Sequence, residues 1–107
     1  MSGIERISAE RQRQIDEEGW SAKHDAEYKN GELTLAAICY ASPLPVRVKA
    51  KVSTGRGLHF PEFRNRWIDP WPWDSVWDKR EQHDQIRKLE IAGALIAAEI
   101  DRLENES

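Results

Sequence analysis

The amino-acid sequence predicts a mainly α fold, with about three main helices and a short β-hairpin and irregular aromatic segment inserted between the second and third. Residues 32–41 are almost entirely apolar, as in a buried helix, and residues 78–104 repeat large apolar residues at intervals of three and four. Between them the apolar repeat shortens to two, which is typical of a strand. We expect one domain over residues 1–107, organised as residues 1–44, 45–77 and 78–105.

The first helix has clear signals at both ends. Ser2 and Glu5 form a capping box, and Gly19 ends the helix after about Glu18. Trp20 is expected to pack on the last turn. Because the helix has few large apolar residues, we predict a surface helix with a narrow buried stripe, formed by Ile4, Ile7 and Ile15.

The second helix should be the most buried element. Asn30 precedes Gly31 in a turn and is a good N-cap, while Pro43 stops the helix because the residue before proline avoids helical angles. Cys39 lies inside this apolar run, so we expect an inert core thiol.

Residues 45–60 favour a hairpin. Apolar and basic residues alternate over 46–52, residues 53–57 make a turn, and residues 58–60 return as a second short strand. We expect residues 61–77 to be irregular, because prolines enforce extended geometry there.

The third helix is predicted from about Asp78 or Lys79 to about Glu104, with Asp78 and Glu81 as a capping pair. Its expected packing stripe is Ile86, Leu89, Gly93, Ile96, Ile100 and Leu103. Further apolar residues widen the stripe, namely Ile91, Ala92, Leu95, Ala97 and Ala98. The helix is therefore either central or a homo-oligomeric interface. The second and third helices should form the core, capped by Trp20, Trp73 and Trp77.

Composition excludes several classes of protein. The chain has 107 residues and one cysteine, which excludes an internal disulfide and a multi-cysteine zinc site. It contains no glycine-rich phosphate loop and no Ser-His-Asp signature. The first twenty residues are polar, so we expect no signal peptide, and the longest apolar run, 91–98, is too short to cross a bilayer. We expect a cytoplasmic protein with no membrane partner.

Charge is unevenly distributed along the chain, whose net charge is -3. Residues 47–66 carry six basic residues against Glu62 alone, between two acidic flanks. This segment could offer a positive patch to a small anionic ligand, or it could lie against the acidic helices or be a solvated hairpin. The acidic flanks would repel a long nucleic acid, which we therefore do not expect as a partner.

Four of the five tryptophans lie between residues 67 and 77. Two interpretations fit this segment: caps over a small core, or a stacking platform for a nucleotide. The second reading rests on interleaved cations and aromatic rings, namely Arg64, Arg66, Trp67 and Trp71. His24, Asp25 and Glu32 form a second candidate, either a metal or acid–base cluster or, for His24, a structural hydrogen-bonding residue.

These motifs together resemble a family of small phage and prophage proteins. The residues that carry the resemblance are 10–15, 18–20, His24-Asp25, 31–33, 36–41, 71–74 and 93–103. The chain departs from the family pattern at Ala26 and Ile91. The resemblance implies a phage or prophage origin and no established activity.

Some relatives in that family are similar to MazG-type nucleotide pyrophosphohydrolases, which are all-α enzymes that bind magnesium through paired carboxylates. That similarity implies Glu32, Glu99 and Asp101 as magnesium ligands, although the full carboxylate pattern is not present.

Three hypotheses for function follow. The favoured one is a non-enzymatic binding protein without a cofactor, which sequesters a nucleotide-type ligand or inhibits a host defence protein. Its expected ligand-binding residues are Arg11, His24, Asp25, Glu32, Arg64, Arg66, Trp67, Trp71 and Trp73. The alternatives are a MazG-like magnesium-dependent hydrolase and a homo-oligomeric assembly protein.

Overall fold

The computed structural model describes residues 1–53 and 63–106 of the chain. Its elements are α1 (Gly3–Glu18), α2 (Ala22–Asp25), α3 (Glu32–Ala41), β1 (Val48–Ser53), β2 (Phe63–Ile68), two 3-10 turns (Ser75–Trp77 and Arg80–Gln82) and α4 (Gln85–Glu106). The mainly α prediction is confirmed. The short α2 and the 3-10 turns are helical segments in addition to the three main helices.

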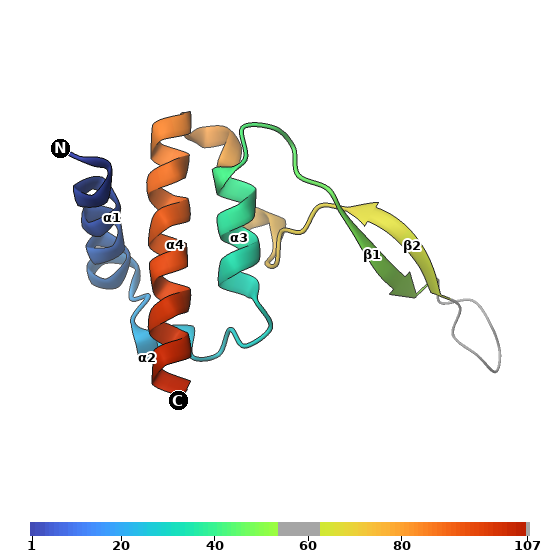
Figure 1. The fold of residues 1–107 in the computed structure, drawn as a ribbon, viewed down its shortest axis with the longest axis horizontal. Coiled ribbons are helices and arrows are strands. Elements are labelled where there is room, and N and C mark those ends of the chain that lie inside the picture. The colour runs from blue at the N-terminus through green and yellow to red at the C-terminus, as the bar shows by residue number, and fades with distance from the viewer. Residues whose placement is uncertain (54–62, 107) are drawn as a thin grey trace.

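Helix α4 lies at the centre of the helical body, with α1 on one side and α3 on the other (Figure 1). The β-hairpin projects away from this body, and the segment after β2 returns to pack against α3 (Figure 1). Within the described ranges, no helix combines the length and apolar character needed to cross a membrane.

The ends of α1 are as predicted, but its buried face is not. Ser2 and Glu5 form the capping box, and Gly19 ends the helix with a φ of 71°. However, α1 buries Glu10, Arg11 and Gln14 and leaves Ile4 82% exposed. The predicted stripe is therefore wrong for Ile4, whereas Ile7 and Ile15 are half-buried and Ile7 contacts Gly93 of α4. Most of the packing of α1 on α4 comes from ion pairs instead, such as Arg87 with Glu10.

The core joins α3 to α4, as predicted. It consists of Leu33, Ala36, Ala37, Tyr40, Ile91, Ala92, Leu95 and Ala98, with Trp20, Tyr28, Ala41, Trp71 and Trp73 packed against it. Trp77 is 65% exposed, so its expected role as a cap was wrong. Gly31 precedes α3 with a φ of 79° and gives no side-chain cap, which corrects the assignment of Asn30 as N-cap. The helix ends at Ala41, two residues before Pro43, as expected.

The hairpin pairs different residues from those expected. β1 and β2 are antiparallel, with Val48 opposite Ile68 and Ser53 opposite Phe63. The second strand therefore lies within the segment predicted to be irregular, while the strand expected at 58–60 falls outside the described residues. Phe63, Trp67 and Ile68 are residue types that favour strands. The prolines lie outside these six residues rather than inside them.

Helix α4 begins later than predicted. Its first turn is capped by Asp84, which accepts a hydrogen bond of 2.8 Å from the Arg87 backbone N–H. Asp78 instead accepts hydrogen bonds from Arg80 between the two 3-10 turns. The expected packing stripe is also wrong as a description of the core, because its large residues are 46–60% exposed, namely Ile86, Leu89, Ile96, Ile100 and Leu103. Four of the five residues thought to widen the stripe belong to the core instead, namely Ile91, Ala92, Leu95 and Ala98.

Candidate functional site

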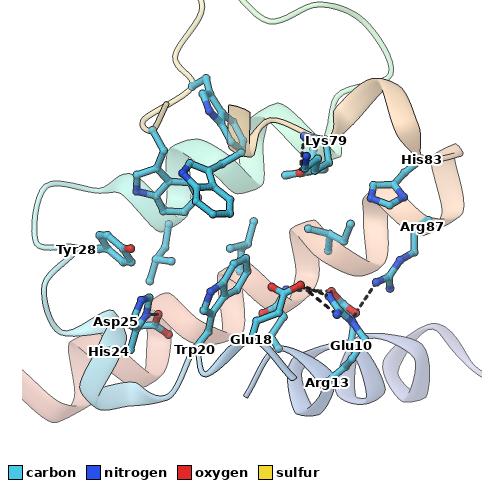
Figure 2. A pocket seen from close by; sticks show the side chains of 18 of the residues that line it. Glu10, Arg13, Glu18, Trp20, His24, Asp25, Tyr28, Lys79, His83 and Arg87 are labelled. Atoms are coloured by element: carbon cyan, nitrogen blue, oxygen red, sulfur yellow. Dashed lines mark hydrogen bonds and ion pairs between the residues drawn. The ribbon is translucent and has the colours of Figure 1, made fainter. Parts of the chain in front are cut away.

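A cavity of about 870 Å³ lies between α1 and α2 on one side and α3 and the tryptophan segment on the other (Figure 2). Its volume falls in the range of small-molecule sites, about 300–1,000 Å³. Core residues of α3 and α4 form part of its wall. The full lining is Glu10, Arg13, Gln14, Glu18, Trp20, His24, Asp25, Tyr28, Leu33, Tyr40, Trp71, Trp73, Asp74, Trp77, Lys79, His83, Arg87, Ile91 and Leu95.

Aromatic rings form a continuous run along the wall of the cavity. The ring of Tyr28 lies 5.5 Å from His24 and 5.2 Å from Trp73, between ring centroids. Trp73 in turn lies 5.6 Å from Trp71, and Trp71 lies 5.8 Å from Tyr40. These distances are typical of packed aromatic pairs. The run offers a large, rigid apolar surface to a planar ligand.

The tryptophan segment is held in place by its own polar contacts. The indole Nε1–H of Trp71 donates to the backbone carbonyl of Asp74 at 3.1 Å. The guanidinium of Arg80 lies 5.5 Å from the Trp71 ring as a cation–π contact and donates to Asp69 at 2.8 Å. These contacts fix Trp71 beside the cavity before any ligand arrives.

The opposite end of the cavity carries basic groups. Figure 2 shows His24, Asp25 and Tyr28 at one end, and Lys79, His83 and Arg87 at the other. Lys79 is positioned by its backbone N–H, which donates to the Tyr40 hydroxyl at 3.2 Å. Among the described residues, the side chains of Lys79 and His83 form no ion pair. They are available to an anionic group on a ligand.

Glu10 lies in the cavity wall, where it is paired with two arginines. It is 3% exposed and accepts hydrogen bonds of 2.7 Å from Arg13 and 3.1 Å from Gln14, while Arg87 lies 2.8 Å away as an ion pair. Burial raises the pKa of Glu10, but the hydrogen bonds from Arg13 and Arg87 outweigh it, so the pKa lies below the usual value. Glu10 is therefore a charged anchor for two arginines and is poorly suited to proton transfer near neutral pH.

Two buried polar atoms of lining residues have no hydrogen-bond partner among the described residues: Oε1 of Gln14 and Nε1 of Trp73. The Gln14 amide is oriented because its Nε2 donates to Glu10, which leaves Oε1 as a free acceptor. A buried polar group without a partner costs about 1–3 kcal/mol. Gln14 Oε1 therefore lacks a donor, and Trp73 Nε1 lacks an acceptor, among the described residues.

Beside the cavity, Arg11 and Asp25 form a buried ion pair. Arg11 Nη2 lies 3.4 Å from Asp25 Oδ2, and Arg11 Nη1 donates to the Trp20 carbonyl at 2.9 Å. Asp25 also lies 3.2 Å from His24 Nδ1. These contacts join α1 to α2 and position His24 and Trp20 on the cavity wall.

The structure brings together only some of the residues expected to bind a ligand. His24, Asp25, Trp71 and Trp73 line the cavity, and Arg11 lies beside it. Arg64, Arg66 and Trp67 are exposed on β2, in the hairpin that projects from the helical body (Figure 1). Glu32 instead accepts from the Asn30 backbone N–H at 2.6 Å.

The three carboxylates expected to bind magnesium have separate partners. Glu99 accepts from Arg102 at 2.6 Å and from the Thr34 hydroxyl at 3.3 Å. Asp101 lies 3.7 Å from Arg11. In residues 1–53 and 63–106, no group of three His, Cys, Asp or Glu side chains is placed to hold a metal ion.

Sequence reasoning missed most of the cavity. Glu10, Arg13 and Gln14 lie outside the apolar stripe predicted for the first helix, and Lys79, His83 and Arg87 were not among the expected ligand-binding residues. Helical spacing gave no signal for this pair, because His83 is extended and precedes the Asp84 cap, whereas Arg87 lies inside α4. No protein-family model, curated protein or solved structure matches the chain.

The charge of Glu10 leads to a prediction about acid stability. Its pKa in the folded protein is below the usual 4.5, so its stabilising contribution is present above that value and is lost as the pH falls through the folded pKa. We expect Glu10→Gln to be less stable than the wild type near pH 7, and the difference to narrow below about pH 4.5. Urea unfolding at a series of pH values measures this. A difference that is constant with pH would contradict it.

Proposed function

We propose that this chain is a small binding protein that holds a nucleotide-type ligand in the cavity, with the base against the aromatic run and the phosphates at the basic end. The observation that carries the proposal is the polarity of the cavity, which has Tyr28 and Trp73 toward one end and Lys79 and His83 at the other. A nucleotide has the same two-part chemistry, because a flat base stacks on aromatic rings and phosphate attracts cations.

The unpartnered atoms of Gln14 and Trp73 support the same ligand class. Gln14 Oε1 requires a donor and Trp73 Nε1 requires an acceptor. Nucleobases carry donors and acceptors side by side on their edges. A nucleobase carries the donors and acceptors that these atoms lack, whereas a purely aliphatic ligand carries neither.

The ion pairs of the carboxylates favour binding of the ligand without hydrolysis. Glu10 is occupied by Arg13 and Arg87, and Asp25 by Arg11. Glu99 and Asp101 have basic partners of their own. A magnesium-dependent reaction needs carboxylates that converge on one ion.

Thermal unfolding against a panel of ligands tests the proposal. The panel contains nucleoside triphosphates, cyclic nucleotides and ADP-ribose derivatives, each with magnesium and with EDTA. A ligand at 100 times its dissociation constant should add about 2.7 kcal/mol, which is several degrees for a domain of this size. We expect the shift to be as large in EDTA as in magnesium. No shift with any member of the panel would overturn the proposal, and a shift that needs magnesium and yields hydrolysed product would favour the hydrolase.

Fragments of the ligand and one matched pair of variants make the test specific. A nucleoside without phosphate and inorganic phosphate alone should each stabilise the protein less than the nucleotide, because each fills one end of the cavity. Lys79→Ala should weaken nucleotide binding by about tenfold, the value of one lost charged hydrogen bond. Lys49→Ala removes an exposed lysine of β1 and serves as the control.

A further inference from the structure

One face of α4 is left uncovered by the rest of the chain. Helices α1 and α3 flank it, and the core residues point to its other side. The uncovered side chains follow a heptad pattern, with spacings of three and four residues, and are Ile86 (60% exposed), Leu89 (46%), Ile96 (50%), Ile100 (51%) and Leu103 (50%). Gly93, at the remaining position of the pattern, is covered, because a Cβ there would lie 2.5 Å from Ile7 Cδ1.

The uncovered face continues onto both neighbouring helices. On α1, Ile4 is one turn from Ile7, which touches Gly93, and is 82% exposed. On α3, Ile38 is one turn from Thr34, whose hydroxyl contacts Glu99, and is 43% exposed. Residues one turn apart share a side of a helix. The apolar face therefore extends across α1, α4 and α3.

The size of this face is that of a dimer interface. Its seven large apolar side chains expose roughly 700 Å², more than the largest apolar patch of a typical monomer, which is about 300–600 Å². A stable dimer buries about 800 Å² on each partner. An amphipathic peptide of another protein would cover the α4 stripe alone, whereas a second copy presents a surface of the same breadth.

We propose that a second copy of the chain covers this face, in a two-fold symmetric dimer whose α4 helices pack antiparallel. In such an interface the same patch is used on both copies. Heptad-spaced apolar residues suit this arrangement, because each stripe supplies both the knobs and the holes. The cavity is lined by residues on other faces, so ligand binding is not required for assembly.

Charge determines the direction of the two helices. Residues 85–95 of α4 carry two basic residues and one acidic residue, whereas residues 96–106 carry four acidic residues and one basic residue. Parallel helices would place the two acidic halves together. Antiparallel helices place each acidic half against the more basic half of the partner, and also oppose the helix dipoles. In this direction Leu89 of one copy lies across from residue 100 of the other.

Sedimentation equilibrium over micromolar concentrations tests the dimer. We expect a mass of about twice 12.4 kDa for the wild type. Ile96→Glu lies at the middle of the stripe and should raise the dimer dissociation constant by about 100-fold or more, because it buries an unpaired charge on each copy. Val76→Glu, at a side chain that is 61% exposed outside this face, is the control.

A wild type that stays monomeric at all concentrations would overturn the proposal, as would an Ile96→Glu protein that associates like the wild type. Circular dichroism is the check that the variants remain folded, which we expect because Ile96 is half exposed. Ile100→Ser gives a second, milder substitution in the same stripe and should weaken association in the same direction.

Disulfide trapping tests the direction of the helices. The double variant Leu89→Cys with Ile100→Cys should form a covalent dimer on mild oxidation, with two disulfides related by symmetry. Ile100→Cys alone should not, and a covalent dimer formed as readily by that single variant would contradict the antiparallel arrangement. The wild type, whose one cysteine is buried, reports any background reaction.

Discussion

Replacing Asp25 with alanine is expected to lower the free energy of unfolding by about 3 kcal/mol or more. Asp25 is 2% exposed and pairs with Arg11, which is 9% exposed. Removing the carboxylate leaves a buried guanidinium whose Nε already lacks a partner. Total stabilities of domains are about 5–15 kcal/mol, so this one change removes a large fraction.

A matched control is available because Arg11 has a second, exposed partner. Asp101 lies 3.7 Å from the same Nη2 and its side chain is 52% exposed. Exposed ion pairs contribute about 0–1 kcal/mol, so Asp101→Ala should have a small effect. Urea unfolding compares the two variants. Equal losses for Asp25→Ala and Asp101→Ala would contradict the importance of the buried pair.

Replacing Trp73 with alanine is expected to weaken nucleotide binding by about 30-fold, within the 1–3 kcal/mol that stacking of one base contributes. Trp73 contacts Tyr28 and Trp71 in the aromatic run and also carries an unpartnered Nε1–H. Trp73→Phe keeps an aromatic surface but removes the donor, so it should lose less affinity than Trp73→Ala and still bind more weakly than the wild type.

Fluorescence titration or calorimetry measures these affinities, and Trp67→Ala is the control. Trp67 is 67% exposed on the hairpin and lies outside the cavity lining. If Trp67→Ala reduced binding more than Trp73→Ala, the ligand would lie on the hairpin, where the sequence analysis had placed part of the site.

Local signals predicted the helix ends well. The capping box at Ser2 and Glu5, the left-handed Gly19 and the bounds of α3 all depend on neighbouring residues, which a sequence displays directly. The start of α4 was wrong because Asp78 and Asp84 both suit a cap, and only the packed structure selects Asp84.

The faces of the helices could not be predicted in the same way. A heptad stripe looks the same whether its partner is in the same chain or in another. The pattern at Ile96 and Ile100 therefore predicted a packing stripe but left open whether the helix was central or an interface between copies, and both residues are half exposed. The polar face of α1 resembles a solvated face, yet Glu10 and Gln14 are buried because their partners come from other elements or other turns. The cavity is assembled from segments that are distant in the sequence, and only its tryptophans and His24-Asp25 were conspicuous beforehand.

The most direct test of the binding proposal is the NMR signal of each tryptophan indole N–H during titration with the nucleotide that stabilises the protein most. The chain has five tryptophans, and their indole signals can be assigned by single substitutions. We predict that the Trp73 Nε1–H signal moves strongly, because its ring belongs to the aromatic run on which we propose that the base stacks, while the exposed Trp67 signal stays in place. A titration in which Trp67 moves and Trp73 does not would contradict binding in the cavity.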